Sequence, residues 1–138
     1  IIMMQNVNIT PLLIPFNRMM FNRNYLYENV ERPEERLKSD VVLCLALLHH
    51  LIIGSGFLIE DVLKTLYDVT SKTLVLEFID LNDFIIRKCP VVFQNLYRTN
   101  SKNYSLDLII NNGKKLFGNL SILESNPSET RKLLVFTK

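Results

Sequence analysis

The longest apolar run of the chain, at residues 41–53, limits the folds that this sequence can adopt. Only His49 and His50 interrupt it. In the segment at residues 40–48, every residue after Asp40 is apolar, so apolar and polar residues do not alternate. A continuous apolar run is typical of a strand buried on both faces, as in a parallel sheet. A buried helix gives the same pattern, and we favour the strand because of the length and context of the run.

The segments after this run alternate between helical and strand-like patterns. After Gly54-Ser55-Gly56, apolar residues recur at helical spacing over residues 59–69, with Glu60 and Asp61 in the first turn. Residues 73–79 then have the pattern of a second buried strand. Strands that alternate with helices predict an α/β fold with a mostly parallel sheet.

The C-terminal third adds short helices and a predicted hairpin. Asp80, Asn82 and Asp83 are candidate caps of a short helix that Pro90 interrupts. Ser105 is the expected N-cap of a helix over residues 106–112, with Gly113 as its stop. Strands at 116–124 and 132–137 flank a turn-rich linker, which predicts an antiparallel hairpin.

The N-terminal part is less regular. Residues 1–7 have the pattern of a short buried strand, and residues 16–40 are expected to form a long loop with a helical turn near Pro33. A strand at the very start indicates that residues 1–138 are the C-terminal part of one domain of a longer protein. The alternative is a short natural protein that begins with its first strand.

One phrase and the order of the elements resemble a known family. The phrase is Ala-Leu-Leu-His-His-Leu at residues 46–51, followed by a helix and by Leu-Val-Leu-Glu-Phe at 74–78. It resembles the C-terminal half of the class I, Rossmann-like S-adenosylmethionine-dependent methyltransferases. The resemblance implies that the two strands are the fourth and fifth of a sheet ordered 3-2-1-4-5-7-6. The terminal hairpin would be strands six and seven, with the seventh antiparallel to the rest.

The resemblance also implies a function and its partners. The protein would use S-adenosylmethionine as cofactor to methylate an unidentified acceptor. All four glycines follow the presumed fourth strand, so the family's glycine-rich loop and the acidic residue of its second strand are missing. We therefore expect the missing N-terminal half of the same domain as a partner, which would also cover an otherwise unpaired edge of the fourth strand. The alternative is a non-catalytic Rossmann-like interaction module. A third interpretation, a different doubly wound nucleotide or sugar enzyme, predicts a parallel final strand.

The resemblance assigns candidate site residues near the ends of two strands. His49 and His50 are candidate catalytic residues, because ligands bind where strands leave an open α/β sheet. Residues that leave a strand point to opposite sides, so we expect at most one of them to face the site. A structural histidine that caps backbone groups is the alternative. The expected cofactor contacts are Asn6, Val7, Cys44, Leu45, Ala46 and His49, although a turn-forming Asn and plain core residues fit the same positions.

Several other groups have simpler explanations. Glu77 interrupts an apolar strand, and we expect it to pair with Arg87, Lys88 or Arg131 rather than to face a ligand. The spacing of the histidines and of the two cysteines, Cys44 and Cys89, does not suit zinc, so no metal is expected.

Composition bounds the compartment and the partners. Two thiols in apolar stretches suit a reducing, cytoplasmic environment. A formal net charge of +2 makes nucleic acid an unexpected partner, and the apolar run is shorter than the ~20 residues that span a membrane.

Overall fold

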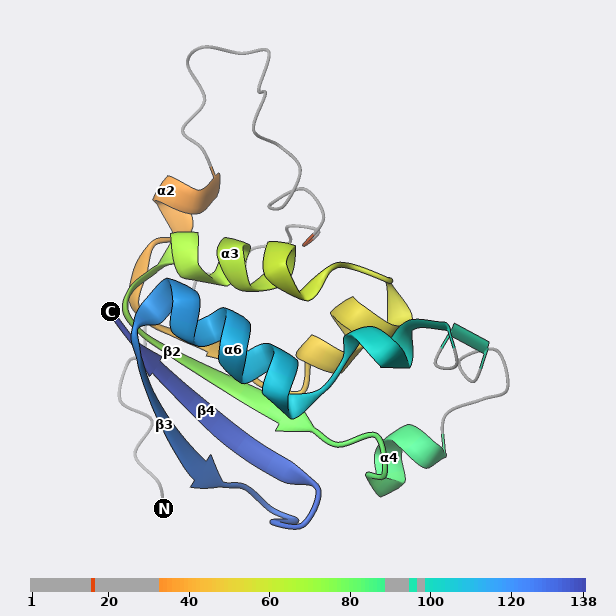
Figure 1. The fold of residues 1–138 in the computed structure, drawn as a ribbon. Coiled ribbons are helices and arrows are strands. Elements are labelled where there is room, and N and C mark those ends of the chain that lie inside the picture. Colours follow the sequence, from red (N-terminus) through yellow and green to blue (C-terminus); the bar gives the residue numbers. More distant parts are fainter. Residues whose placement is uncertain (1–15, 17–32, 89–94, 97–98) are drawn as a thin grey trace, which may run out of the picture.

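The computed structural model describes residues 16, 33–88, 95–96 and 99–138. Within them, four strands form one mixed sheet in the order β1-β2-β4-β3. Figure 1 shows β4 between β2 and β3. The strands are β1 (Ser39–Cys44), β2 (Thr70–Ile79), β3 (Asn119–Glu124) and β4 (Arg131–Thr137). β1 and β2 are parallel, whereas β4 is antiparallel to both of its neighbours.

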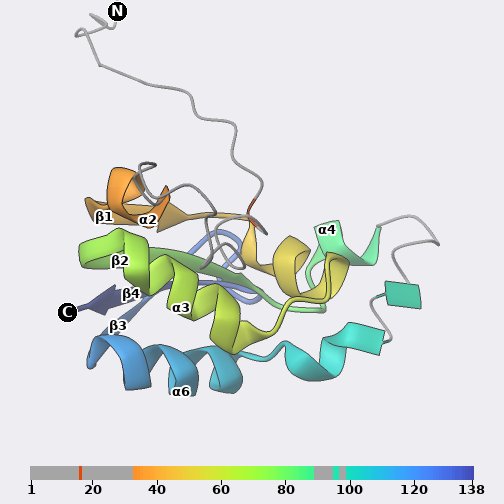
Figure 2. The same ribbon diagram turned by 90° about the horizontal axis from the view of Figure 1, so that it is seen from above.

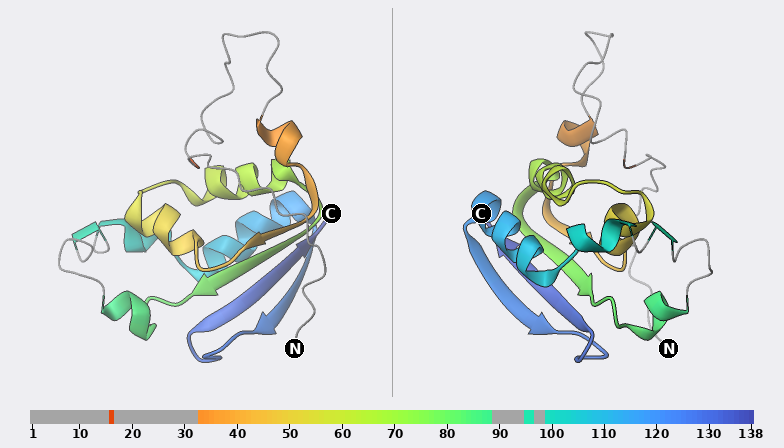
Figure 3. Two further views of the ribbon diagram at one scale, coloured as in Figure 1. Left: turned by 180° about the vertical axis from the view of Figure 1, so that it is seen from behind. Right: turned by 45° about the vertical axis from the view of Figure 1, so that its right-hand side comes forward.

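The predicted α/β class and the C-terminal hairpin are confirmed. β3 and β4 pair as antiparallel strands, and β4 lies between β2 and β3. Figure 3 shows the hairpin at the side of the sheet away from β1. Parallel pairing is confined to β1 and β2 in the described part, so this sheet is mixed rather than mostly parallel. The final strand is antiparallel, and the interpretation as a different doubly wound enzyme with a parallel final strand is therefore wrong.

Two amphipathic helices cover one face of the sheet. α3 (Ile59–Val69) contacts β1 and β2, and α6 (Leu106–Phe117) contacts β3 and β4 (Figure 2). Alternate side chains of the strands point toward these helices, because successive residues of a strand face opposite ways. The sheet side of this core is fully buried at Leu74, Leu76, Leu134 and Phe136.

The short helices follow local capping signals. α2 (Pro33–Leu37) begins at the proline that predicted a helical turn. The short helix α4 (Phe84–Arg87) begins after Asp83, whose side chain accepts a hydrogen bond from the backbone N–H of Ile85 at 2.9 Å. Asp80 instead accepts from the N–H of Asn82 and caps a turn, not a helix. A 3₁₀ turn, η2 (Ser101–Asn103), precedes α6.

The strand predicted at residues 40–48 is shorter and less buried than expected. β1 ends at Cys44, and a helical segment that includes the π-helix η1 (His50–Gly54) follows. The prediction that this strand is buried on both faces was wrong, because Val41 is 55% exposed and Leu43 is 63% exposed. Val41 and Leu43 alternate with Val42 and Cys44, which face the helices, and no described element covers Val41 and Leu43 on the opposite face.

The predicted stop of α6 at Gly113 was also wrong. Ser105 is the N-cap as expected, with its hydroxyl accepting from the N–H of Leu108, but the helix continues to Phe117. It ends at Gly118, whose φ of 87° suits a residue without a Cβ. Gly113 lies against the ring of Phe136, where an added Cβ would be 2.3 Å from ring carbons. That glycine permits close packing of the helix on β4.

The strand predicted at residues 1–7, including Asn6 and Val7, lies outside the described residues, as does most of the predicted loop. Among the helices that are described, none has the length and apolar character needed to cross a membrane.

Candidate functional site at the carboxyl ends of β1 and β2

β1 ends at Cys44, opposite Leu76, and the parallel β2 continues to Ile79. Open α/β sheets bind ligands at the carboxyl ends of their parallel strands. The connection after β1 leaves apolar side chains at the surface, with Leu45 50% exposed and Leu47 39% exposed. Ala46 lies between them with a φ of 51°, in the left-handed region that residues other than glycine rarely adopt. We call residues 45–47 the β1 exit.

Glu77 of β2 holds the β1 exit through a backbone contact. Its Oε2 accepts a hydrogen bond from the N–H of Ala46 at 2.9 Å. Its Oε1 accepts from the hydroxyl of Ser125 at 3.4 Å and lies 3.6 Å from Nη1 of Arg131. The prediction that Glu77 pairs with a basic residue is confirmed, and Arg131 is that residue. The carboxylate is buried, and these partners offset the cost of removing it from water.

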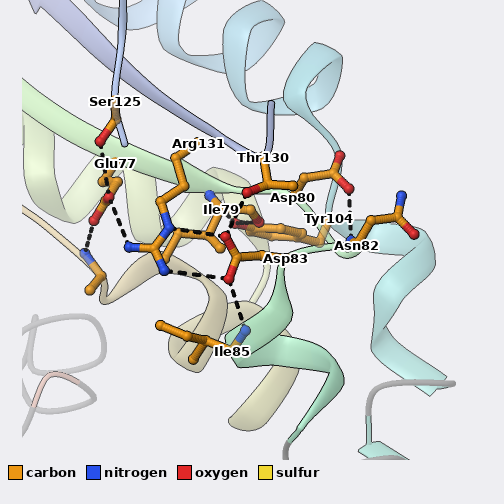
Figure 4. Close-up of polar contacts among 11 residues, drawn as sticks. Glu77, Ile79, Asp80, Asn82, Asp83, Ile85, Tyr104, Ser125, Thr130 and Arg131 are labelled. Atoms are coloured by element: carbon orange, nitrogen blue, oxygen red, sulfur yellow. Dashed lines mark hydrogen bonds and ion pairs between the residues drawn. The ribbon is translucent and has the colours of Figure 1, made fainter. Parts of the chain in front are cut away.

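Arg131 connects Glu77 to Asp83, the N-cap of α4 (Figure 4). Its Nε lies 3.0 Å from Oδ2 of Asp83, and its Nη2 donates to Oδ1 at 3.4 Å. The Thr130 hydroxyl donates to the same carboxylate at 2.7 Å. Mainly because of the hydrogen bond from Arg131, the pKa of Asp83 is lowered to about 2. We call Glu77, Asp83 and Arg131 the carboxylate–arginine network.

Tyr104 forms hydrogen bonds to the last residue of β2 from the sheet face that α3 and α6 cover. Its hydroxyl donates to the carbonyl of Ile79 at 2.9 Å and accepts from the N–H of the same residue at 3.2 Å. The ring stacks on Phe78, and burial raises the pKa of the phenol. Both β1 and β2 therefore end at positions fixed by side chains from elsewhere in the fold.

The two histidines lie on the helical segment after the β1 exit, not on a strand. The expectation that they point to opposite sides thus loses its basis, and their ring centroids lie 4.0 Å apart. His49 is buried and His50 is exposed. Nδ1 of His49 is buried without a hydrogen-bond partner in the described part of the chain.

The electrostatic surroundings keep His49 neutral near pH 7. Burial, followed by the nearby positive charges of His50 and Arg131, lowers its pKa to about 4. The neutral ring has one nitrogen that accepts a hydrogen bond or a proton.

Cys44 lies in the core rather than at the surface. It is buried beside Leu76, its register partner on β2, and burial raises the pKa of the thiol to about 12. Its side chain is therefore an unreactive core group. Of the predicted cofactor contacts within the described residues, Leu45, Ala46 and His49 lie together along the β1 exit and the helical segment that follows it.

Sequence reasoning did not assemble the carboxylate–arginine network. Asp83 was expected only as a cap, and Arg131 as one of three partners for Glu77. The available signal was the acidic residue within an apolar strand, but the pairing of β2 with β4 decides which arginine reaches it. No cluster of three or more metal-ligating side chains occurs within the described ranges.

The chain was compared with known proteins at three levels. No family model matches it, and neither a curated protein nor a solved structure matches it. The functional proposal therefore rests on the strand order and on the residues at the carboxyl ends of the strands.

Proposed function

We propose that this chain is the C-terminal half of a Rossmann-like methyltransferase domain that transfers a methyl group from S-adenosylmethionine to an unidentified acceptor. One observation carries the proposal: the strand order β1-β2-β4-β3, with β4 reversed between β2 and β3. The last four strands of the class I methyltransferase sheet, 4-5-7-6, have this order and this reversal. Because many functions share one fold, the residues at the strand ends must carry the chemistry.

The β1 exit fits one side of a cofactor site. Leu45 and Leu47 expose apolar surface at the end of a parallel strand, and small-molecule sites are mostly apolar. His49 adds a buried nitrogen without a partner among the described residues. The missing N-terminal half would supply the glycine-rich loop and the ribose-binding carboxylate.

Within this proposal, the described residues bind and orient the reactants. S-adenosylmethionine supplies an electrophilic methyl group on sulfur. Leu45 and Leu47 form a wall that excludes water, and the held backbone of Ala46 keeps that wall in place. Alignment of reactants supplies much of the rate in such transfers. His49 and His50 are the two candidate groups to accept a proton from the methyl acceptor. The lowered pKa of His49 makes its ring the weaker base, so a hydrogen bond from the acceptor or the cofactor suits it better, and the exposed His50 is the candidate for the proton.

A non-catalytic interaction module is the second candidate, and a specific observation favours it. The charged groups of the carboxylate–arginine network are paired with one another. The sheet face opposite α3 and α6 also exposes apolar side chains, which are typical of a docking surface. In this case the protein would bind a partner through that face and bind no cofactor.

Calorimetric titration of the full-length protein with S-adenosylhomocysteine separates the two functions. We expect measurable heat and an increase in melting temperature. Leu45→Glu should weaken binding at least tenfold, because it places a charge on the apolar wall. Leu108→Glu on the exposed side of α6 is the matched control and should leave the affinity unchanged. Absence of both heat and a thermal shift in the unaltered protein would favour the interaction module.

A further inference from the structure

The conformation of Ala46 requires support from the rest of the fold. A left-handed backbone at a residue with a Cβ is unfavourable and persists where the surroundings hold it. The hydrogen bond from its N–H to Glu77 spans 31 positions of the sequence and supplies such support. The β1 exit is therefore fixed by a side chain of the neighbouring strand.

Glu77 is itself held by contacts from β4, the neighbour of β2 on the side away from β1. Arg131 lies at the start of β4 and contacts both Glu77 and Asp83, so it joins β2 to the start of α4 (Figure 4). Ser125 and Thr130, which flank the β3–β4 turn, donate to Glu77 and Asp83 respectively. A continuous set of contacts thus runs from the hairpin and α4 to the backbone of Ala46.

Stability alone gives little reason to bury the ion pair between Glu77 and Arg131. Val75 and Ile79 share the sheet face of Glu77, and both are apolar. Replacing a buried ion pair with apolar residues of similar volume is often neutral or stabilising. An apolar residue at position 77 could not accept the hydrogen bond from Ala46. What Glu77 adds over an apolar residue is this hydrogen bond, which fixes the conformation of the β1 exit.

We propose that Glu77 and Arg131 are positioning residues that hold the β1 exit in the conformation that binds the cofactor. This inference rests on the proposed function. Neither side chain need touch the cofactor, because Glu77 acts through Ala46 and Arg131 acts through Glu77. Pre-organising a binding segment increases affinity by removing the cost of ordering it.

Two substitutions of Glu77 test this role in the full-length protein. Glu77→Met removes the acceptor but leaves Arg131 paired with Asp83, so the protein should still fold. We expect its affinity for S-adenosylhomocysteine to fall about tenfold, which equals about 1.4 kcal/mol. Glu77→Gln keeps an acceptor oxygen and should retain affinity within about threefold. Glu124→Met, at an exposed ion pair of β3, is the matched control and should bind like the unaltered protein.

A purely structural role makes a different prediction. Glu77→Met and Arg131→Met would lower the melting temperature but leave the affinity of the folded protein unchanged. That result, or failure of Glu77→Gln to rescue binding, would overturn the proposal. If Glu77→Met does not fold, the triple variant with Asp83→Asn and Arg131→Met removes all three charges of the carboxylate–arginine network, and its affinity is expected to fall by the same tenfold.

Hydrogen exchange at Ala46 gives a readout that needs no cofactor. Ala46 is the single alanine of the chain, so ¹⁵N-alanine labelling reports its amide as one resonance from this segment. We expect slow exchange in the unaltered protein and in Glu77→Gln, and at least tenfold faster exchange in Glu77→Met. Fast exchange in the unaltered protein would overturn the positioning role. Slow exchange without any cofactor binding would reject the methyltransferase and leave the contact between Glu77 and Ala46 supported.

Discussion

The two faces of the sheet carry apolar residues, yet in the described structure helices cover only one of them along its length. On the face beneath α3 and α6, Leu76 and Phe136 are fully buried. On the opposite face, Leu43 is 63% exposed and Leu123 is 53% exposed. The same strands supply both sets, because side chains alternate along each strand. The comparison shows that an apolar position predicts burial only when another element lies over it.

The open face also changes character along β2. Its apolar part includes Leu43 and its register partner Val75, whereas its carboxyl end contains Glu77 and the buried Ile79. At that end, Arg131 and the start of α4 cover the strand and pair its carboxylate. The open face therefore has an exposed apolar part and a closed polar part, and each part can be tested separately.

The largest effect is expected on the covered face. Phe136→Ala removes a fully buried ring against Gly113, and we expect the free energy of unfolding to fall by about 3 to 5 kcal/mol. Urea unfolding followed by circular dichroism measures this change. Leu108→Ala, on the exposed side of α6, should change it by less than about 0.5 kcal/mol. Similar small losses in both variants would contradict the covered core.

The next effect concerns His49 at the closed end. Its pKa is lowered from 6.5 to about 4, so the unfolded chain binds a proton more readily between these values. Stability should therefore fall by about 3 kcal/mol as the pH decreases from about 6.5 to about 4, and it should change little above that window. His49→Gln should remove this pH dependence in urea unfolding measured at several pH values. An identical slope in the variant would show that His49 is accessible to protons in the folded state.

Asp83 has the opposite role at the same end, because its charged form stabilises the fold. Its pKa is lowered from 3.8 to about 2, mainly by the hydrogen bond from Arg131. It contributes about 2 kcal/mol above pH 4, and this contribution is lost as the pH falls toward 2. Asp83→Asn should lower stability at pH 7 by about that amount and flatten the acid part of the profile. Asp40→Asn, in an exposed pair with Lys72, is the control and should have little effect.

Local patterns predicted most of the covered face. The helical spacing of residues 59–69 predicted α3, and Ser105 correctly marked the start of α6. Gly113 misled the prediction because a glycine can end a helix or permit close packing, and only the position of Phe136 decides between them. Long-range packing is not encoded in the local pattern of a helix.

The candidate site could be predicted only in part. The run at residues 40–48 correctly predicted a strand at its start, but it gave no sign that the strand ends at Cys44. The left-handed turn at Ala46 depends on a carboxylate 31 positions away, so no local pattern indicates it. The partner of Glu77 likewise depends on the register of β2 with β4.

The smallest effect should occur on the open face, where it tests the proposed missing half of the domain. Leu43→Ala in the chain of residues 1–138 should change the free energy of unfolding by less than about 0.5 kcal/mol, because the side chain is exposed. In a longer protein whose N-terminal half covers β1, the same change should cost about 2 to 3 kcal/mol, since it would remove a buried side chain. Parallel urea unfolding of both proteins measures the difference. Equal small effects in both would mean that the open face remains uncovered, and the partner would then have to bind elsewhere.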